Sequence, residues 1–284
     1  MHRFVTEEKI SGVGEEILLG KEESAHASKV LRLRPGEPVQ LIDGENRYDA
    51  VLTEVSAEGT RARVTALCPS PEATAQAVLW QGLPKADKLE LIAQKATELG
   101  AWEIWPVEML RSVARLGKND SKKQERLSRI ALEAAKQSGR AHVPEVRGAV
   151  SFEKALKRLE EEPFDLILVA WEEEHALPLS KAVEKYRQSH DELKRVLIVI
   201  GPEGGIDEAE QQRLATLGAQ SVTLGPRILR TETAGLCALA ALWTAMGEMS
   251  TNARKGNDHG ENRRSRYAGL QGKSIRHRGH AGGF

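Results

Sequence analysis

The stretch Val196-Leu197-Ile198-Val199-Ile200-Gly201-Pro202-Glu203-Gly204-Gly205-Ile206-Asp207 joins an unbroken apolar run to a turn with three glycines. A continuous apolar run is typical of a central strand in a parallel sheet, whose two faces are both covered. Glycines allow a tight turn, and Asp207 with Glu210 is the signature of a helix start. We therefore expect a strand, a glycine-rich turn and a helix. The turn either offers its N–H groups to a ligand or is a simple connection.

A second segment of this kind is Leu224-Gly225-Pro226-Arg227-Ile228-Leu229-Arg230-Thr231-Glu232-Thr233-Ala234. It follows a predicted strand over 221–224 and leads into a predicted helix over 232–246, with Thr231 or Thr233 as N-cap. Open α/β sheets bind ligands at the carboxyl ends of their strands, so two arginines and a glutamate here indicate a functional loop. The alternative is an Arg–Glu pair that only holds the loop closed. The helix is apolar on nearly every side, so we expect it to be buried, within the chain or against a second subunit.

Strands and helices alternate outward from these segments. Apolar residues at a spacing of three or four predict a helix that begins at Asp87 and Glu90, which form a capping-box signature, and ends at Gly100. A longer helix is predicted over 122–139. Short apolar runs predict further strands at 77–80, 104–107 and 165–170. This alternation predicts an α/β domain with a parallel sheet.

The first 70 residues have a different character. They contain three runs of strand type, at 38–42, 48–55 and 60–67, and one predicted helix around 22–33. Several short strands with tight turns predict a small β-barrel. Two prolines in the stretch 68–72 are typical of a linker. We therefore expect a barrel over 1–72 and the α/β domain over 73–250.

Composition excludes several classes of protein. With 284 residues, of which 40% are hydrophobic and 29% charged, the chain fits about two globular domains. Lys+Arg and Asp+Glu are equal at 41 each, which excludes a uniformly basic nucleic-acid binder. Residues 251–284 nevertheless carry eight basic and two acidic side chains, and we expect a disordered basic tail there. Two cysteines, no signal peptide and no membrane-spanning stretch indicate a cytoplasmic protein that binds no membrane.

Several common motifs are absent. There is no Walker motif, no GxGxxG after a strand and no GxSxG, so nucleoside triphosphates, dinucleotides and serine-hydrolase chemistry are not supported. No His or Cys cluster has the spacing of a zinc site, and we expect no metal.

The two loops together resemble the signature of the SPOUT superfamily of knotted methyltransferases, and the chain is most similar to the ribosomal RNA small subunit methyltransferase E family. The similarity covers roughly residues 1–248 and includes further segments in the family's order: Met1-His2-Arg3-Phe4, His26 with 29–33, 91–100, 111–113 and 137–140. Lys136 departs from the pattern, which usually has an acidic residue there. The resemblance implies a PUA-like RNA-binding barrel, a trefoil-knotted methyltransferase domain and a homodimer.

By resemblance, the chain uses S-adenosyl-L-methionine to methylate N3 of a specific uridine in 16S ribosomal RNA, in the small ribosomal subunit. The cofactor-binding residues that this implies are Ile200, Gly201, Glu203, Gly204, Gly205, Leu224, Gly225, Ile228, Leu229, Arg230, Thr231 and Ala234.

Methylation at N3 requires that a weakly acidic proton be removed or the resulting anion stabilised. Our hypothesis is that Arg230 or Arg227 stabilises charge on the uracil oxygens, and that Glu232 or Glu203 accepts the proton. RNA binding also needs cations, although for any single one a solvated surface position is the alternative. The residues that we expect to contact RNA are Arg3, Lys29, Arg32, Arg34, Arg111 and Arg140.

Two other functions fit the same sequence. One is a SPOUT methyltransferase that acts on another RNA site or on a ribose 2′-hydroxyl. The other is a noncatalytic RNA-binding factor for ribosome assembly, against which the retained loops argue.

Overall fold

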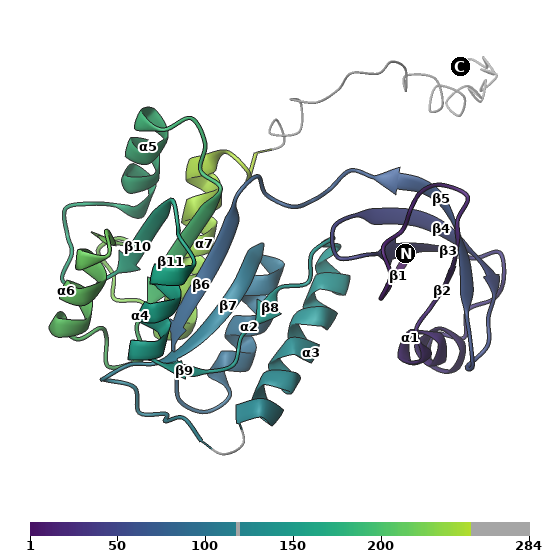
Figure 1. Ribbon diagram of the computed structural model, residues 1–284, viewed down its shortest axis with the longest axis horizontal. Coiled ribbons are helices and arrows are strands. Elements are labelled where there is room, and N and C mark those ends of the chain that lie inside the picture. The colour runs from purple at the N-terminus through teal and green to yellow at the C-terminus, as the bar shows by residue number, and fades with distance from the viewer. Residues whose placement is uncertain (118–119, 251–284) are drawn as a thin grey trace, which may run out of the picture. The chain divides into compact units, whose positions relative to one another are not determined.

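The computed structural model describes residues 1–117 and 120–250 (Figure 1). The chain divides into two units, Met1–Met249 and Ser250–Phe284. The predicted basic tail over 251–284 lies outside the described residues. Among the residues described, none of the helices combines the length and apolar character needed to cross a membrane.

A five-stranded sheet forms the N-terminal part of the first unit. Its order is β1-β3-β4-β5-β2; β1 is parallel to β3, and the other pairs are antiparallel. The sheet packs around a core that contains Phe4, Leu41 and Leu52. The three predicted strands are confirmed, whereas closure into a barrel stays a prediction, because β1 and β2 form the two edges. The strands are β1 (His2–Val5), β2 (Glu16–Leu18), β3 (Pro38–Ile42), β4 (Arg47–Glu54) and β5 (Arg61–Cys68).

The helix expected around 22–33 is shorter and has two parts. It begins as α1 (Lys21–Ala25) and continues as a π-helical turn, η1 (His26–Val30). Arg32 then adopts φ +53°, a left-handed conformation that is uncommon for residues other than glycine, and the chain leaves the helix there.

The second sheet has seven strands and only parallel pairings. Its order is β12-β10-β11-β6-β7-β8, and β9 also pairs with β7. This confirms the predicted α/β domain, while the knot stays a prediction. The carboxyl ends of parallel strands lie at one edge of the sheet, so the loops that leave them are neighbours. The strands are β6 (Gln76–Gly82), β7 (Ala101–Glu108), β8 (Glu145–Val146), β9 (Val150–Ser151), β10 (Leu166–Ala170), β11 (Arg195–Ile200) and β12 (Gln220–Val222).

Helices cover both faces of this sheet (Figure 1). One face carries α2 (Lys88–Glu98), α3 (Asp120–Ser138), α5 (Leu179–Ser189) and α7 (Thr231–Met246). The other carries α4 (Phe152–Glu161) and α6 (Glu208–Thr216). The two cores exist because successive side chains of β11 point to opposite faces, as the apolar run 196–200 predicts.

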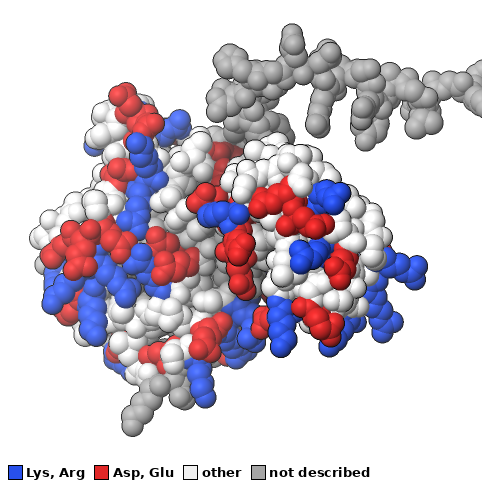
Figure 2. Space-filling model, turned by 45° about the vertical axis from the view of Figure 1, so that its right-hand side comes forward, with Lys and Arg blue, Asp and Glu red and all other residues white. Residues whose placement is uncertain are grey.

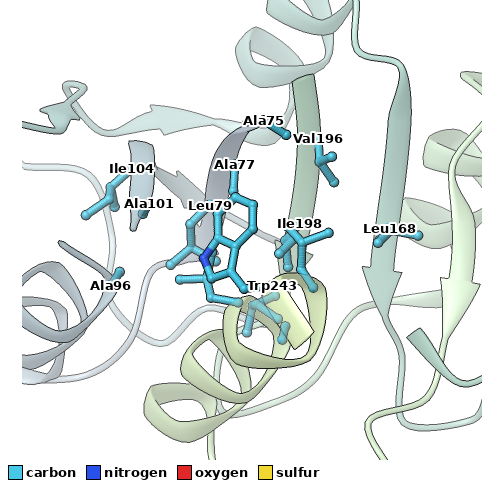
Figure 3. Packing of buried hydrophobic residues seen from close by; sticks show 14 of the residues in the cluster. Ala75, Ala77, Leu79, Ala96, Ala101, Ile104, Leu168, Val196, Ile198 and Trp243 are labelled. Carbon is cyan, nitrogen blue, oxygen red and sulfur yellow. The ribbon is translucent and has the colours of Figure 1, made fainter. Parts of the chain in front are cut away.

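Figure 3 shows the larger core, where Leu79 of β6 and Ile198 of β11 lie beside Trp243 of α7. The indole Nε1 of Trp243 donates a hydrogen bond to the carbonyl of Leu99 over 2.6 Å. Helix α7 is therefore buried on its sheet side, as predicted. Its opposite side is more open, and Cys237 there is exposed.

Two predicted helix starts are wrong in detail. The side chain of Asp87 makes no capping hydrogen bond, and Glu90 pairs instead with Arg126 of α3 at 2.8 Å. At the start of α7 the N-cap is Arg230, and Thr231 is already the first helical residue. Tertiary partners bind Glu90 and Thr231, which are therefore not available for local capping.

Side chains of the N-terminal sheet hold the carboxyl end of α3. Nη1 of Arg3 donates to the carbonyl of Lys136 over 2.7 Å, and Nη1 of Arg47 donates to that of Gly139 over 2.8 Å. Cations at this end of a helix satisfy carbonyls that lack intrahelical partners. The amine of Lys136 also lies 2.7 Å from Oε1 of Glu23, so the unusual lysine has an acidic partner. These contacts make residues 1–249 one unit, and the domain boundary at residue 72 stays a prediction.

Candidate functional site

Two loops at the carboxyl edge of the parallel sheet line one cavity of about 540 Å³. One loop follows β11 and the other follows β12. The volume lies within the usual range for small-molecule sites. The residues that the sequence assigns to the cofactor all line this cavity: Ile200, Gly201, Glu203, Gly204, Gly205, Leu224, Gly225, Ile228, Leu229, Arg230, Thr231 and Ala234.

The glycine-rich loop has no room for side chains at two positions. Gly205 adopts φ +75°, and a Cβ there would overlap Oε1 of Glu172. A Cβ at Gly204 would lie only 2.9 Å from the Cβ of Arg111. Glycine therefore lets this backbone lie against its neighbours and form a wall of the cavity.

The second loop is open around Gly225 and tied down at its end. Gly225 adopts φ +110°, and a Cβ there would meet no protein atom within 4 Å. The hydroxyl of Thr231 donates to the carbonyl of Gly201 over 2.6 Å and accepts a hydrogen bond from Nε2 of Gln81 at 2.8 Å. These buried bonds join the ends of both loops to β6.

Lys88 is a site residue that sequence reasoning missed. Its amine lies 2.9 Å from Oε1 of Glu203 and 3.1 Å from Oε2 of Glu232. Hydrogen bonds to Glu203 and then to Glu232 raise the pKa of Lys88, so the amine stays protonated. Lys88 and Glu203 line the cavity.

The two glutamates that pair with Lys88 are poor proton acceptors. Burial acts to raise the pKa of Glu203, but the hydrogen bond from Lys88 and backbone N–H donors outweigh it, and the pKa falls below its usual value. The pKa of Glu232 is lowered by its own backbone N–H and further by Lys88. A carboxylate with a lowered pKa holds a proton weakly. The geometry therefore favours binding of Lys88 over the predicted role as general base.

Arg227 and Arg230 both line the cavity and are exposed. Within residues 1–117 and 120–250, neither arginine forms an ion pair with a carboxylate. The alternative of an Arg–Glu pair that closes the loop is not supported, because Glu232 pairs with Lys88.

Sequence reasoning also missed the polar and aromatic lining residues Trp171, Glu172 and His175. They follow the apolar run that became β10, at the same edge of the sheet. The position of that run was a usable signal, because loops at this edge bind ligands. No group of three or more His, Cys, Asp or Glu side chains in the described part of the chain is arranged to hold a metal ion.

The expected RNA contacts divide into two groups. Lys29, Arg32 and Arg34 are exposed beside the N-terminal sheet, and Arg111 is exposed near the glycine-rich loop. Nη2 of Arg111 lies 3.2 Å from Oδ2 of Asp207. Figure 2 shows acidic and basic side chains interspersed over the visible face, so individual positions matter more than overall charge.

Arg140 and Arg3 are held by the protein itself. Arg140 is only 4% exposed; Nη2 lies 2.6 Å from Oε2 of Glu72, and Nη1 donates to the carbonyl of Ala101 over 2.6 Å. A buried guanidinium with these partners is not available to RNA, so we remove Arg140 from the set of RNA contacts. Arg3 donates hydrogen bonds to the carbonyls of Lys136 and Gln137 at the end of α3.

A comparison with known proteins finds relatives that match the part of the chain with the parallel sheet. A family model described as "RNA methyltransferase domain" matches residues 71–243. The protein named Ribosomal RNA small subunit methyltransferase E from Bacillus subtilis (strain 168) is 40% identical over 225 residues, which cover 78% of this chain and 87% of that protein.

Two similar solved structures contain a methyl donor. A Ribosomal RNA small subunit methyltransferase E from Neisseria gonorrhoeae bound to S-adenosyl methionine is 31% identical, with a TM-score of 0.73 and coverage of 86% of this chain and 97% of that one. A putative methyltransferase from Legionella pneumophila, in complex with SAM, is 27% identical, with a TM-score of 0.72 and coverage of 86% and 97%.

Proposed function

The chain belongs to the ribosomal RNA small subunit methyltransferase E family, and from this premise we propose that it methylates N3 of a specific uridine in 16S ribosomal RNA. It is an S-adenosylmethionine-dependent ribosomal RNA methyltransferase. The observation that carries the proposal is the shared cavity of about 540 Å³, which is lined by the glycines of the loop after β11 and by two exposed arginines of the loop after β12.

The residues around the cavity fit S-adenosylmethionine. When bound, this cofactor supplies a methyl group activated by a sulfonium ion. The missing side chains at Gly204, Gly205 and Gly225 allow a ligand to approach the backbone closely, and at Gly225 the space beside the backbone is open. Leu224, Ile228 and Leu229 provide apolar surface for a planar base, as small-molecule sites usually do.

Arg227 and Arg230 are the groups that we assign to the nucleobase. Loss of the N3 proton leaves negative charge on the uracil ring, and a preorganised guanidinium stabilises such charge without reorganising. Because Glu203 and Glu232 are weak bases, we assign the proton to solvent water. The remaining contribution is positioning, since N3 must lie in line with the methyl carbon. The uridine must also be unstacked to reach the cavity.

We also propose that the substrate is the small ribosomal subunit and that the enzyme acts as a cytoplasmic homodimer. The dimer follows from the family resemblance and is supported by exposed apolar side chains near the site. Ile228 is 93% exposed and Leu91 of α2 is 44% exposed, and a contact with a second subunit would remove this apolar surface from water. Size-exclusion chromatography with light scattering tests the oligomeric state.

The decisive experiment measures methyl transfer from labelled S-adenosylmethionine to small subunits and to naked 16S RNA that lack their own modification. Mass spectrometry of the digested nucleosides identifies the product. We expect a single 3-methyluridine. Label on another base or on a ribose would keep the enzyme class and overturn the proposed target. Cofactor binding without transfer to any RNA would favour the noncatalytic alternative.

A further inference from the structure

A second cavity, of about 360 Å³, lies at the same edge of the parallel sheet. It is lined by Leu83 and Pro84, which follow β6, and by Pro106 of β7. Residues of α3 complete it, among them Arg126. All strands of the sheet run in one direction, and β6 lies beside β11. This cavity therefore neighbours the cavity of about 540 Å³, which we call the cofactor cavity, along the carboxyl edge.

The lining combines an apolar surface with exposed cations and with the carboxylates of Asp87, Glu90 and Asp120. Arg115, Lys123 and Arg126 contribute side chains that are 60%, 68% and 66% exposed. Each is paired with a carboxylate that is 21–25% exposed. Ion pairs with a solvated cation contribute little to stability, so a phosphate can compete with the carboxylate for the cation. Apolar surface beside exchangeable cations suits a nucleotide, whose base or sugar packs while its phosphate is neutralised.

The segment after β6 contacts both cavities. The backbone N–H of Lys85 donates to Oε1 of Glu203 over 3.1 Å, and Lys88 lines the cofactor cavity. Between them, Ala86 lines the second cavity and adopts φ +52°. A left-handed conformation at a residue other than glycine costs energy and is often found at ligand sites.

Residues 109–117, which follow β7, also line the second cavity and contact the wall of the cofactor cavity. Nη1 of Arg111 donates to the carbonyl of Gly204 in the glycine-rich loop, over 3.4 Å. Three and four residues later, Ala114 and Arg115 line the second cavity. Two separate segments therefore form a shared wall, and a ligand in the second cavity would lie next to the methylation site.

We propose that the second cavity binds an unstacked RNA nucleotide adjacent in sequence to the methylated uridine, with a phosphate at Arg115 and Arg126. This inference rests on the proposed function and specifies how its RNA is selected. A nucleotide held here fixes the register of the RNA, so the enzyme selects one uridine by the context of its neighbour.

The first test removes the cations. In Arg115→Ala/Arg126→Ala we expect RNA affinity to fall about tenfold. The slope of log affinity against log salt should decrease by about 0.7, the value for one lost phosphate contact with single-stranded RNA. The Kd for S-adenosylmethionine should stay unchanged. Lys185→Ala on α5 is the control, because Lys185 is exposed and lines neither cavity.

The second test fills the cavity with Ala149→Trp and uses RNA that lacks the base next to the methylated uridine. The wild-type enzyme should bind this abasic RNA more weakly, whereas the filled variant should bind both RNAs equally. Far-ultraviolet circular dichroism and S-adenosylmethionine binding verify that each variant is folded.

The outcomes separate the two proposals. If the wild-type enzyme methylates no small-subunit RNA, the proposed function fails. If it methylates its uridine but the double-arginine variant behaves like Lys185→Ala, the second cavity is not an RNA site. If the missing base lowered RNA affinity by the same factor in the wild type and in Ala149→Trp, the inference would be overturned in the same way.

Discussion

The amine of Lys88 lies 2.9 Å from Oε1 of Glu203, so the first residue of α2 is joined to the glycine-rich loop after β11. The same amine lies 3.1 Å from Oε2 of Glu232 in the first turn of α7. One cation therefore joins three segments that are distant in sequence. The shape of the cofactor cavity depends on all three.

Replacing Lys88 with methionine should weaken S-adenosylmethionine binding about five- to tenfold, because the glycine-rich loop loses a charged hydrogen-bond partner. The side chain keeps its length and apolar stem, so the fold should persist. Isothermal titration calorimetry measures the Kd. Lys95→Met is the matched control, since Lys95 lies on the same helix and pairs with Glu98 outside the cavity. Equal affinities in both variants would remove Lys88 from the binding site.

The lowered pKa values of Glu203 and Glu232 lead to a prediction about the stability of the site at low pH. Both are lowered in the folded protein, so the ionised carboxylates stabilise the site fully above the unfolded glutamate pKa of about 4.3. This contribution is lost as the pH falls through the lowered values. Carbon-13 NMR of the carboxyl groups should give titration midpoints below that of free glutamate. In Lys88→Met both midpoints should rise, and unchanged midpoints would contradict the ion-pair network.

Local patterns in the sequence predict the strands of five or more residues in the described part of the chain, because burial on both faces of the sheet demands unbroken apolar runs such as that of β11. The shorter strands β1, β2, β8 and β9 are not predicted. They also predict that the two loops meet, since parallel strands end at one edge. Helix α4 was missed although its signal is present. Phe152, Ala155, Leu156 and Leu159 have helical spacing and are buried, and Ser151 caps the helix.

Other features depend on partners that no local pattern reveals. Lys88 binds Glu203, which lies 115 residues away in the sequence, and Arg140 binds Glu72, which lies 68 residues away. A basic residue in an otherwise polar segment is usually exposed. The sequence alone therefore predicts an RNA contact at Arg140, whereas the fold buries its side chain.

Gly205→Ala should abolish most S-adenosylmethionine binding and also lower stability. The backbone at φ +75° is strained for alanine, and the new Cβ would overlap Glu172. The strain costs about 1–2 kcal/mol. Gly218→Ala, after α6, is a control for strain alone, because φ is +85° and a Cβ there meets no atom within 4 Å. Thermal unfolding of Gly218→Ala should show a loss of stability from backbone strain alone. Calorimetric titration of the same variant should show a normal affinity for S-adenosylmethionine.

Arg140→Ala should destabilise the protein by about 3–5 kcal/mol, because it leaves the carboxylate of Glu72 without its buried partner. Urea unfolding measures this loss. The double variant Arg140→Met/Glu72→Leu should recover much of it, because it removes both charges together. In the folded single variant the salt dependence of RNA binding should match wild type. A reduced salt slope would restore Arg140 as an RNA contact.

Arg230→Ala tests the assignment of charge stabilisation at the nucleobase. Removal of one preorganised donor to a developing anion typically lowers the rate about 10²–10³-fold. We expect a loss of this order in single-turnover methylation at saturating RNA and cofactor. If Arg230 favours the ionised uracil, the rise of the rate with pH should also move to higher pH in the variant, and Arg230→Lys should restore part of this shift. Arg227→Ala under the same conditions shows how the two arginines share the role. A lower rate with an unchanged pH profile would mean that Arg230 positions the loop at the start of α7 instead of stabilising the anion.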